Sequence, residues 1–261
     1  MLSCIIPSYK DKYLHPTIKS ILDNAVGEVE IIAVLDGYWT EVINDPRVRV
    51  LHLGRNRGMR GAINAGVAIA KGKYLMRTDE HCSFAKGFDK EIIDHMEDNW
   101  IVTPTRYELD PIRWKRMNIP PVNFTKLIIQ HTETGKKFTA VPWKERDEEL
   151  KDVMIAETMG MQGSVWFMKK SWWDKVIVEL QTEGYGQLIQ DSTEMIFKTW
   201  KAGGKMMLNK LTWHSHRHRK FGRLHNNGTL ENPANQDAGY AYAIRIWNEY
   251  YQDIVRPKWN I

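Results

Sequence analysis

Apolar runs alternate with amphipathic helical patterns along the first hundred residues. The predicted strands are residues 2–6, 29–35, 48–53, 74–76 and 100–103. Three helices are predicted: one begins at Pro16, the second spans residues 58–70, and the third contains Ile92. Strands that are apolar throughout and separated by helices predict an α/β fold. Its central sheet is expected to be mostly parallel and covered by helices on both faces.

Three polar turns directly follow predicted strands. They are Pro7-Ser8-Tyr9, Asp36-Gly37 and Asp79-Glu80-His81. Ligands of parallel α/β sheets bind beyond the carboxyl ends of the strands, and these turns lie at those ends. We therefore expect the three turns to form one candidate site.

Regular patterning weakens over residues 105–157, where we predict loops on the acceptor side. It returns with predicted strands at residues 164–168 and 205–208 and predicted helices at residues 171–180, 191–202 and 238–251. No internal repeat, low-complexity linker or composition break separates these parts. The sequence therefore predicts a single domain.

The composition excludes several classes of protein. Of the 261 residues, 43% are hydrophobic and 26% are charged, which is typical of folded globular chains and excludes a mostly disordered or collagen-like chain. Two cysteines, Cys4 and Cys82, are too few for a disulfide scaffold. No apolar stretch is long enough to span a bilayer. We expect a soluble cytoplasmic protein without a membrane anchor.

The positive charge is concentrated in one part of the chain. The formal net charge is +5, yet eight Lys or Arg, four His and no acidic residue lie between Met195 and Leu230. Such a cluster forms either a solvated basic surface or a surface for an anion. A diphosphate, an acidic polymer, a nucleic acid and an anionic membrane all fit this charge.

The turn Asp79-Glu80-His81 is a candidate metal site. Residues i and i+2 of an extended chain point to the same side, so Asp79 and His81 can reach one ion. One oxygen and one nitrogen ligand suit Mn²⁺ or Mg²⁺, which take further ligands from a substrate phosphate. The alternative is a surface turn with two polar side chains.

A second candidate lies in the basic segment, where His214, His216 and His218 alternate. If this segment is extended, one histidine can complete the metal shell while Arg217, Arg219 and Lys220 meet phosphate. Zinc is disfavoured because no paired cysteines accompany the histidines. The alternative is a basic surface loop.

Two further positions have both a structural and a functional interpretation. Gly58 opens a helix rich in small residues, which favours either close packing on the sheet or close approach of the backbone to a ligand. Asp191 stands at a predicted helix start, where it can cap the helix or accept a proton from an acceptor hydroxyl.

Together these segments resemble glycosyltransferases of the GT-A fold, which is Rossmann-like. Ile5-Ile6-Pro7-Ser8-Tyr9 and Asn56-x-Gly58 followed by Ala62-x-Asn64-x-Gly66 are similar to family 2 enzymes. Four other features are closer to polypeptide N-acetylgalactosaminyltransferases. They are Asp79-x-His81-Cys82, the stretch 161–167, the helix from Asp191 to Gly204 and the position of His216. The resemblance spans residues 1–102 and 160–220.

The resemblance implies a nucleotide-sugar donor, a UDP-sugar, and a divalent cation, Mn²⁺ or Mg²⁺, bound by Asp79, His81 and His216. The implied donor-binding residues are Pro7, Ser8, Tyr9, Asp36, Gly58, Arg60, Thr78, Asp79, Glu80 and Gly163. The implied acceptor-side carboxylate is Asp191. His214, Arg217, His218, Arg219 and Lys220 are expected near the phosphates or the acceptor.

The resemblance also suggests how the single domain is divided. Residues 1–102 would bind the nucleotide-sugar, residues 103–230 would complete the metal site and bind the acceptor, and residues 231–261 would form a helical tail. Gln190-Asp191 lies between the patterns of inverting and retaining enzymes, so the stereochemistry stays open. No lectin domain or membrane anchor is recognised, which favours a bacterial or phage-infected cytoplasm over the secretory pathway.

The predicted function is metal-dependent transfer of a sugar to an acceptor hydroxyl. The acceptor is either a saccharide or polymer, or a hydroxymethylated base of phage-type DNA. A nucleotidyltransferase is an alternative, but Pro7-Ser8-Tyr9-Lys10 is not the glycine-rich loop that it needs after the first strand. A non-catalytic nucleic-acid-binding module is another, but it gives Asp79, His81 and Asp191 no role.

Overall fold

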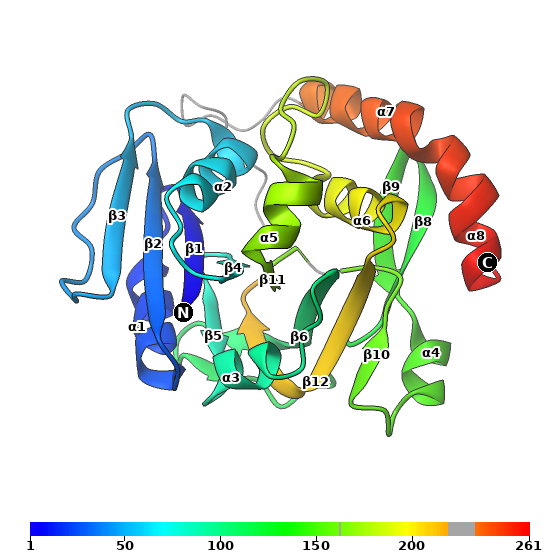
Figure 1. Ribbon diagram of the computed structural model, residues 1–261. Coiled ribbons are helices and arrows are strands. Elements are labelled where there is room, and N and C mark those ends of the chain that lie inside the picture. Colours follow the sequence, from blue (N-terminus) through cyan, green and yellow to red (C-terminus); the bar gives the residue numbers. More distant parts are fainter. Residues whose placement is uncertain (162, 219–232) are drawn as a thin grey trace.

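A computed structural model describes residues 1–161, 163–218 and 233–261. A ten-stranded sheet runs through its centre, and its main path has the order β10-β12-β6-β11-β4-β1-β2-β3 (Figure 1). The strands on this path are β1 (Leu2–Ser8), β2 (Val29–Asp36), β3 (Val48–Leu53), β4 (Tyr74–Thr78), β6 (Trp100–Asp110), β10 (Ile155–Glu157), β11 (Val165–Lys169) and β12 (Lys205–His216). Two short strands lie off it, β5 (Cys82–Phe84) on β12 and β7 (Lys115–Arg116) on β6.

The pairing of the strands confirms the predicted α/β fold with a mostly parallel sheet. Strands β3, β2, β1 and β4 are parallel to one another, and β6 is parallel to β12. Strand β11 is antiparallel to both β4 and β6 and joins these two parallel groups.

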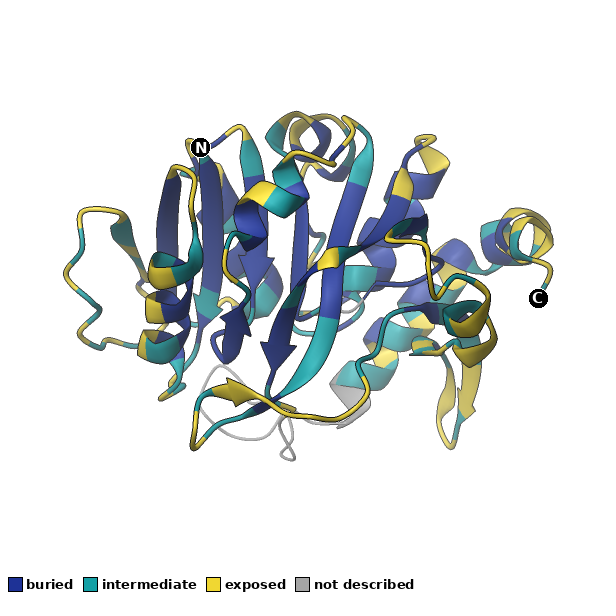
Figure 2. Ribbon diagram, turned by 90° about the horizontal axis from the view of Figure 1, so that it is seen from below, coloured by how far each residue is buried: buried dark blue, intermediate teal, exposed yellow. Residues whose placement is uncertain are grey.

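Helices cover both faces of the sheet, and alternate strand residues pack against them (Figure 2). Helices α1 (Leu14–Asn24) and α3 (Phe88–Ile93) pack on the face that contains Cys4 and Ile6. The opposite face, which contains Ile5, is covered by α2 (Gly58–Ala68), α5 (Lys170–Trp172) with the π-helical turn η1 (Trp173–Ile177), and α6 (Asp191–Lys201).

Close packing explains the small residues of α2. A Cβ atom added at Gly66 would stand 2.5 Å from the Ile5 side chain on β1. Such a contact is too short for any side chain, so the helix approaches the sheet only because glycine is present. The predicted small-residue helix against the sheet is therefore confirmed.

The prediction of loops over residues 105–157 was wrong. This stretch contains the hairpin β8 (Thr125–Thr132) and β9 (Gly135–Pro142), followed by α4 (Lys144–Glu149). The hairpin packs against the C-terminal helices α7 (Pro233–Tyr250) and η2 (Tyr251–Val255), which α8 (Arg256–Trp259) follows. Phe138 packs on Tyr251, whose hydroxyl donates a hydrogen bond to the Leu127 carbonyl at 2.9 Å. Long-range packing of this kind leaves no local periodicity.

Two strands are longer than the sequence predicts, because their ends pair with each other. Strand β6 continues from the predicted end at residue 103 to Asp110, and β12 continues from residue 208 to His216. Their paired residues include Trp213 with Thr105 and His216 with Glu108. The polar residues in these two extensions hide the strand pattern in the sequence. The extensions form regular strands because they pair with each other.

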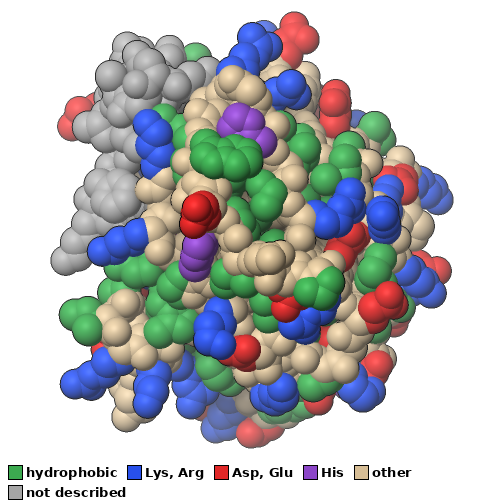
Figure 3. Space-filling view, turned by 90° about the vertical axis from the view of Figure 1, so that its left-hand side faces the viewer, with side chains coloured by type: hydrophobic (Ala, Val, Ile, Leu, Met, Phe, Trp, Pro, Cys, Tyr) green, Lys and Arg blue, Asp and Glu red, His purple; other side chains and the backbone are tan. Residues whose placement is uncertain are grey.

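The surface beyond β3 mixes charges of both signs. Figure 3 shows basic, acidic and hydrophobic side chains interspersed on this face. The excess positive charge of the chain is therefore not gathered on this face. None of the helices in the described part of the chain is both long enough and apolar enough to cross a membrane.

A buried ion pair connects α2 to α6, and further hydrogen bonds connect α2 to the segment that precedes α6. The Arg60 guanidinium is fully buried, contacts Glu194 and donates hydrogen bonds to the carbonyls of Gln181 and Ile189 at 2.7–2.9 Å. It also lies 4.3 Å from the centre of the Tyr185 ring. These contacts position the chain that leads to Asp191.

Replacing Arg60 with alanine should lower the free energy of unfolding by about 3–5 kcal/mol, because the Glu194 carboxylate is then buried without its main partner. Urea denaturation followed by circular dichroism measures this loss. The double variant R60M/E194L removes both charges and should recover much of the stability. A loss below 1 kcal/mol in R60A would show that the pair does not stabilise the fold.

Candidate metal and nucleotide-sugar site

The three predicted turns meet at a cavity of about 620 Å³ at the carboxyl ends of β1, β2 and β4. The predicted site residues that line it are Pro7, Ser8, Tyr9, Asp36, Gly58, Asp79, Glu80, His81, Gly163, Asp191 and His216. Volumes of this size are typical of small-molecule sites. The expected single site at this edge of the sheet is present.

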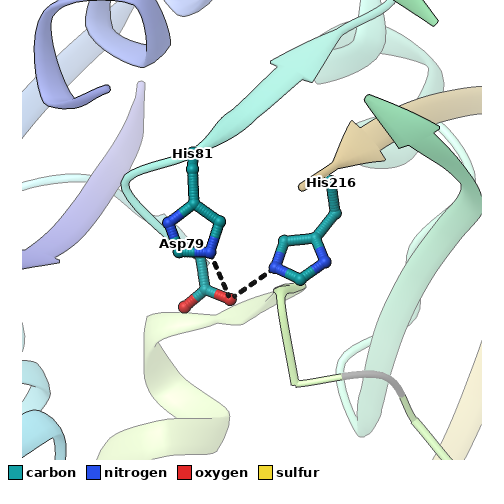
Figure 4. Close-up of side chains that lie close together, drawn as sticks. All are labelled: Asp79, His81 and His216. Carbon is teal, nitrogen blue, oxygen red and sulfur yellow. Dashed lines mark ion pairs between the residues drawn. The ribbon is translucent and has the colours of Figure 1, made fainter. Parts of the chain in front are cut away.

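Asp79, His81 and His216 converge at one end of the cavity (Figure 4). Asp79 Oδ2 lies 3.1 Å from His216 Nε2 and 3.9 Å from His81 Nε2. His81 follows β4, whereas His216 ends β12, where it is paired with Cys82 of β5. The sheet therefore brings together three potential metal ligands that are distant in sequence.

A carboxylate that the sequence analysis missed orients His81. Asp11 Oδ2 lies 3.0 Å from His81 Nδ1, so this nitrogen can donate its proton to Asp11 and leave Nε2 facing Asp79. Asp11 Oδ1 also accepts a hydrogen bond from the Tyr13 backbone at 2.9 Å. A second carboxylate behind a ligating imidazole is a common support in metal sites. Asp11 lies in a short polar loop that has no distinguishing pattern.

Arg77 is a second residue that the sequence analysis missed. Its guanidinium is 2% exposed, donates to Asp79 Oδ1 at 2.6 Å and contacts the Gly163 carbonyl. Burial raises the pKa of Asp79, but Arg77 and the two histidines outweigh this effect and hold that pKa well below its usual range. Asp79 is therefore ionised at every physiological pH.

The residues present fit a divalent cation. Burial lowers the pKa values of His81 and His216, so both imidazoles are neutral near pH 7 and keep a lone pair for a metal. Two imidazole nitrogens and one carboxylate oxygen, all within 4.8 Å of one another, form a donor set suited to Mn²⁺. Nδ1 of His216 has no hydrogen-bond partner among the described residues.

Glu80 faces the β1 side of the cavity. Its carboxylate accepts hydrogen bonds from the Tyr9 backbone at 3.2 and 3.3 Å. Burial, with a smaller contribution from Asp79, raises the pKa of Glu80 to about 8. Most Glu80 side chains are therefore uncharged at neutral pH, which limits the negative charge beside Asp79.

Asp36 forms the other end of the cavity. Its Oδ1 accepts a hydrogen bond from the Arg57 backbone at 2.7 Å, which ties the end of β2 to the turn before α2. Burial raises the pKa of Asp36 to about 6 despite this bond. Nearby, Ser8 shares a hydrogen bond with Tyr38, an aromatic residue that the sequence analysis did not single out.

Asp191 is the first residue of α6 and is 7% exposed. The helix cap is Gln190, whose φ of 56° is in the left-handed region, and it forms no side-chain cap hydrogen bond. Asp191 Oδ2 has no hydrogen-bond partner among the described residues, although it lines the cavity. The capping interpretation of Asp191 is therefore not supported, and a carboxylate oxygen stays available to a ligand.

Arg106 is a third residue that the sequence analysis missed. It lies on β6 and lines the cavity beside the histidines. Its Nε atom is buried without a hydrogen-bond partner in the described part of the chain. Burial lowers the pKa of Arg106, but an arginine remains charged at neutral pH. This cation is available to an anionic ligand.

Several predicted site residues lie elsewhere. Arg60 does not line the cavity, because its guanidinium is engaged by Glu194 as described above. Thr78 is buried, and its hydroxyl donates a hydrogen bond to the Asp79 carbonyl. His214 is also buried, with Nε2 3.0 Å from Ser164 Oγ.

Gly58 lines the cavity and also packs on Gln187. A Cβ atom added at Gly58 would stand 2.4 Å from the Gln187 side chain.

The basic segment after β12 is only partly described. Arg217 covers the Tyr13 ring at 4.7 Å, and His218 pairs with Glu108 at 3.0 Å. Neither lines the cavity. Arg219 and Lys220 lie outside the described residues.

Replacing Asp36 with asparagine should change the pH dependence of stability. A folded-state pKa of about 6, above the ordinary value of an aspartate, means that Asp36 destabilises the fold as the pH rises from 4 to 7. The stability of the variant relative to the unmodified chain should therefore increase by about 2 kcal/mol between pH 4 and pH 7. Urea denaturation at both pH values measures this. A pH-independent difference would contradict the raised pKa.

Comparison with known proteins agrees with this geometry. Residues 3–143 match the family model of glycosyl transferase family 2. The glycosyltransferase GlyG of Streptococcus pneumoniae is 34% identical over 88 residues, which are 30% of this chain and 29% of GlyG. An uncharacterized glycosyltransferase of Haemophilus influenzae is 24% identical over 128 residues, 46% of this chain and 40% of the relative. The matches thus span less than half of either relative.

A solved structure has the same fold. The crystal structure of GalNAc-T7 with UDP, GalNAc and Mn²⁺ superposes with a TM-score of 0.72 at 16% sequence identity. The similarity covers 97% of this chain and 50% of GalNAc-T7. It confirms the predicted GT-A fold. The family model covers more than half of the sequence, and the chain accordingly belongs to glycosyl transferase family 2.

Proposed function

We propose that the protein transfers a sugar from a UDP-sugar to an acceptor hydroxyl with the help of Mn²⁺ or Mg²⁺. The observation that supports this most strongly is the convergence of Asp79, His81 and His216 in the same cavity as Asp36 and Asp191. The cavity thereby combines a ligand set for a cation, polar groups for a nucleoside and a carboxylate with an unpartnered oxygen. The Mn²⁺ and UDP of the GalNAc-T7 crystal structure are consistent with this proposal.

The nucleoside would lie between the β1 and β2 ends. Asp36, held by the Arg57 backbone, presents a carboxylate that can accept a hydrogen bond from a base N–H group. Pro7, Ser8 and Tyr9 provide the opposite wall, and the backbone at Gly58 lies close to the cavity. These groups orient the donor so that its diphosphate faces Asp79.

The diphosphate would lie beside the three ligands of the cation. A bound divalent cation would neutralise the charge that develops on the departing nucleotide. Arg77 and Asp11 fix the carboxylate and the His81 imidazole that would hold it. Arg106 adds a fixed positive charge at the wall of the same cavity, where negative charge increases during transfer.

The acceptor would enter on the side of Asp191 and the β8–β9 hairpin. Thr125, Ala140 and Pro142 of this hairpin line the cavity together with Asp191. The unpartnered Oδ2 of Asp191 can accept the proton of the attacking hydroxyl. A base in this position fits a single displacement that inverts the anomeric centre. The acceptor is a saccharide or polymer, or a hydroxymethylated DNA base.

A donor screen tests the proposed function. The purified protein with MnCl₂ is offered a panel of UDP-sugars and released UDP is measured, because many glycosyltransferases slowly hydrolyse their own donor. UDP release from one donor, lost on addition of EDTA, supports the proposal. Release of pyrophosphate from a nucleoside triphosphate and a sugar phosphate would instead indicate a nucleotidyltransferase. No turnover with any donor would contradict both enzymatic functions.

Replacing Asp79 with alanine should reduce Mn²⁺-stimulated UDP release by more than about 100-fold, because the cation loses its only carboxylate ligand in the cluster. Calorimetric titration with MnCl₂ should show a parallel loss of affinity. Asp98→Ala, which removes a carboxylate that is 89% exposed, is the matched control. Unchanged release by D79A would exclude Asp79 from the metal site.

Replacing Asp191 with asparagine should separate transfer from donor binding. Transfer to a cognate acceptor should fall by about 100-fold or more, the usual contribution of a general base. Mn²⁺ and UDP affinity, measured by calorimetry, should stay within about threefold of the unmodified chain. Full transfer activity in D191N would rule out Asp191 as the base.

A further inference from the structure

A second cavity of about 610 Å³ lies behind the metal cluster, between α1 and the β6–β7 turn. Its lining includes Lys19 on α1, Trp114, Lys115 and Arg116 in the turn, and Trp213 on β12. Trp213 and His216 belong to the same strand, so this strand contributes to both cavities. The residues that line this cavity do not line the first cavity.

Two of the three Lys and Arg side chains of this cavity are available for a ligand. Within the described part of the chain, Lys115 and Arg116 form no ion pair with a carboxylate, whereas Lys19 pairs with Asp23, which lines the same cavity. The Arg116 guanidinium lies 4.4 Å from the centre of the Tyr107 ring and 5.0 Å from that of Trp213. Two rings therefore hold this charge in place, which reduces the entropy lost when it binds an anion.

The aromatic residues are also held in a defined arrangement. Trp114 stacks on Tyr13 with ring centres 5.6 Å apart and an interplanar angle of 20°. Its φ of 53° is in the left-handed region, and Asp110 Oδ1 stabilises the preceding turn by accepting the N–H groups of Ile112 and Arg113. The indole N–H of Trp114 is buried without a partner among the described residues. A strained position with an unused donor is typical of functional sites.

A continuous set of contacts connects this cavity to the metal cluster. Asp11 contacts both His81 Nδ1 and the backbone N–H of Tyr13, and Tyr13 stacks on Trp114. The Arg217 guanidinium lies 4.7 Å from the centre of the Tyr13 ring, and its backbone N–H donates to the His81 carbonyl at 3.1 Å. Cations and aromatic rings thus alternate from the metal cluster to the second cavity.

We propose that this surface, formed by Tyr13, Trp114, Lys115, Arg116, Trp213 and Arg217, binds a single-stranded stretch of nucleic acid. Fixed cations match backbone phosphates, and the Trp114 and Trp213 rings that line the open cavity match unpaired bases. A membrane-docking surface needs a contiguous apolar patch rather than this alternation. The inference rests on the proposed function, because it selects DNA over a saccharide or polymer as the acceptor.

The test measures binding directly and does not depend on turnover. Fluorescence anisotropy with a labelled single-stranded 20-mer DNA is recorded from 50 to 200 mM NaCl. Binding should weaken steeply with salt, because cations displace counterions from the phosphates. The double variant K115A/R116A should bind about 10- to 100-fold more weakly and reduce the salt slope by about 2. The matched control K175A/K201A makes the same charge change on exposed lysines elsewhere and should bind like the unmodified chain.

Two further variants keep the test falsifiable if K115A/R116A is unstable. Lys115 is exposed, so K115A alone should fold normally and still bind the DNA more weakly. Arg116→Lys keeps the charge and should therefore bind the DNA more tightly than K115A/R116A. Absence of salt-dependent binding, or an equal loss in K175A/K201A, would overturn the proposal. So would equal competition by dextran sulfate or by vesicles containing phosphatidylglycerol, which would indicate a general anion surface. UDP release in the donor screen tests the enzymatic function separately, so the two proposals can fail independently.

Discussion

The pairing of β12 with β6 and β5 is the constraint on which the candidate site depends. In this register His216 is paired with Cys82, one residue after His81, and both imidazoles face Asp79. Successive residues of a strand point to opposite faces, so a shift by one residue would turn His216 away from the cluster. The same alternation places Trp213 at the second cavity. This strand thereby contributes His216, one of the three candidate metal ligands, and Trp213 of the neighbouring basic and aromatic surface.

Neighbouring side chains determine the charge of each carboxyl group within the site. Arg77 keeps Asp79 ionised in a buried position, whereas Glu80, one residue along the chain, has its pKa raised to about 8. Two adjacent carboxyl groups thus differ in charge at neutral pH, because the Arg77 guanidinium is hydrogen-bonded to Asp79, whereas the effect of burial dominates at Glu80. Burial also keeps the histidines neutral. The result is a cluster with one fixed negative charge and two neutral nitrogen donors, to which a cation adds with little rearrangement.

The family resemblance correctly predicted the fold class, but it assigned Arg60 to the donor pocket. In the structure this guanidinium is buried against Glu194 and two carbonyl groups, where it positions the segment leading to Asp191. Arg77 and Arg106, which no motif identified, line the cavity instead. Arginine is suited to both tasks, because its planar group can bind several acceptors at once. Burial and partners decide between these tasks, and neither is visible in a motif.

The sequence by itself determined the alternation of buried strands and helices, because burial on both faces leaves continuous apolar runs. It also determined that the polar turns at residues 7–9, 36–37 and 79–81 share one edge of the sheet. Only the tertiary structure decided which distant groups join them. Three arrangements depend on contacts between residues that are far apart in the chain or lie in irregular loops. They are Asp11 behind His81, the β8–β9 hairpin beside Asp191, and Trp114 stacked on Tyr13. Such contacts leave no periodic pattern, since they are stabilised by packing and charge pairing that form only when the chain has folded.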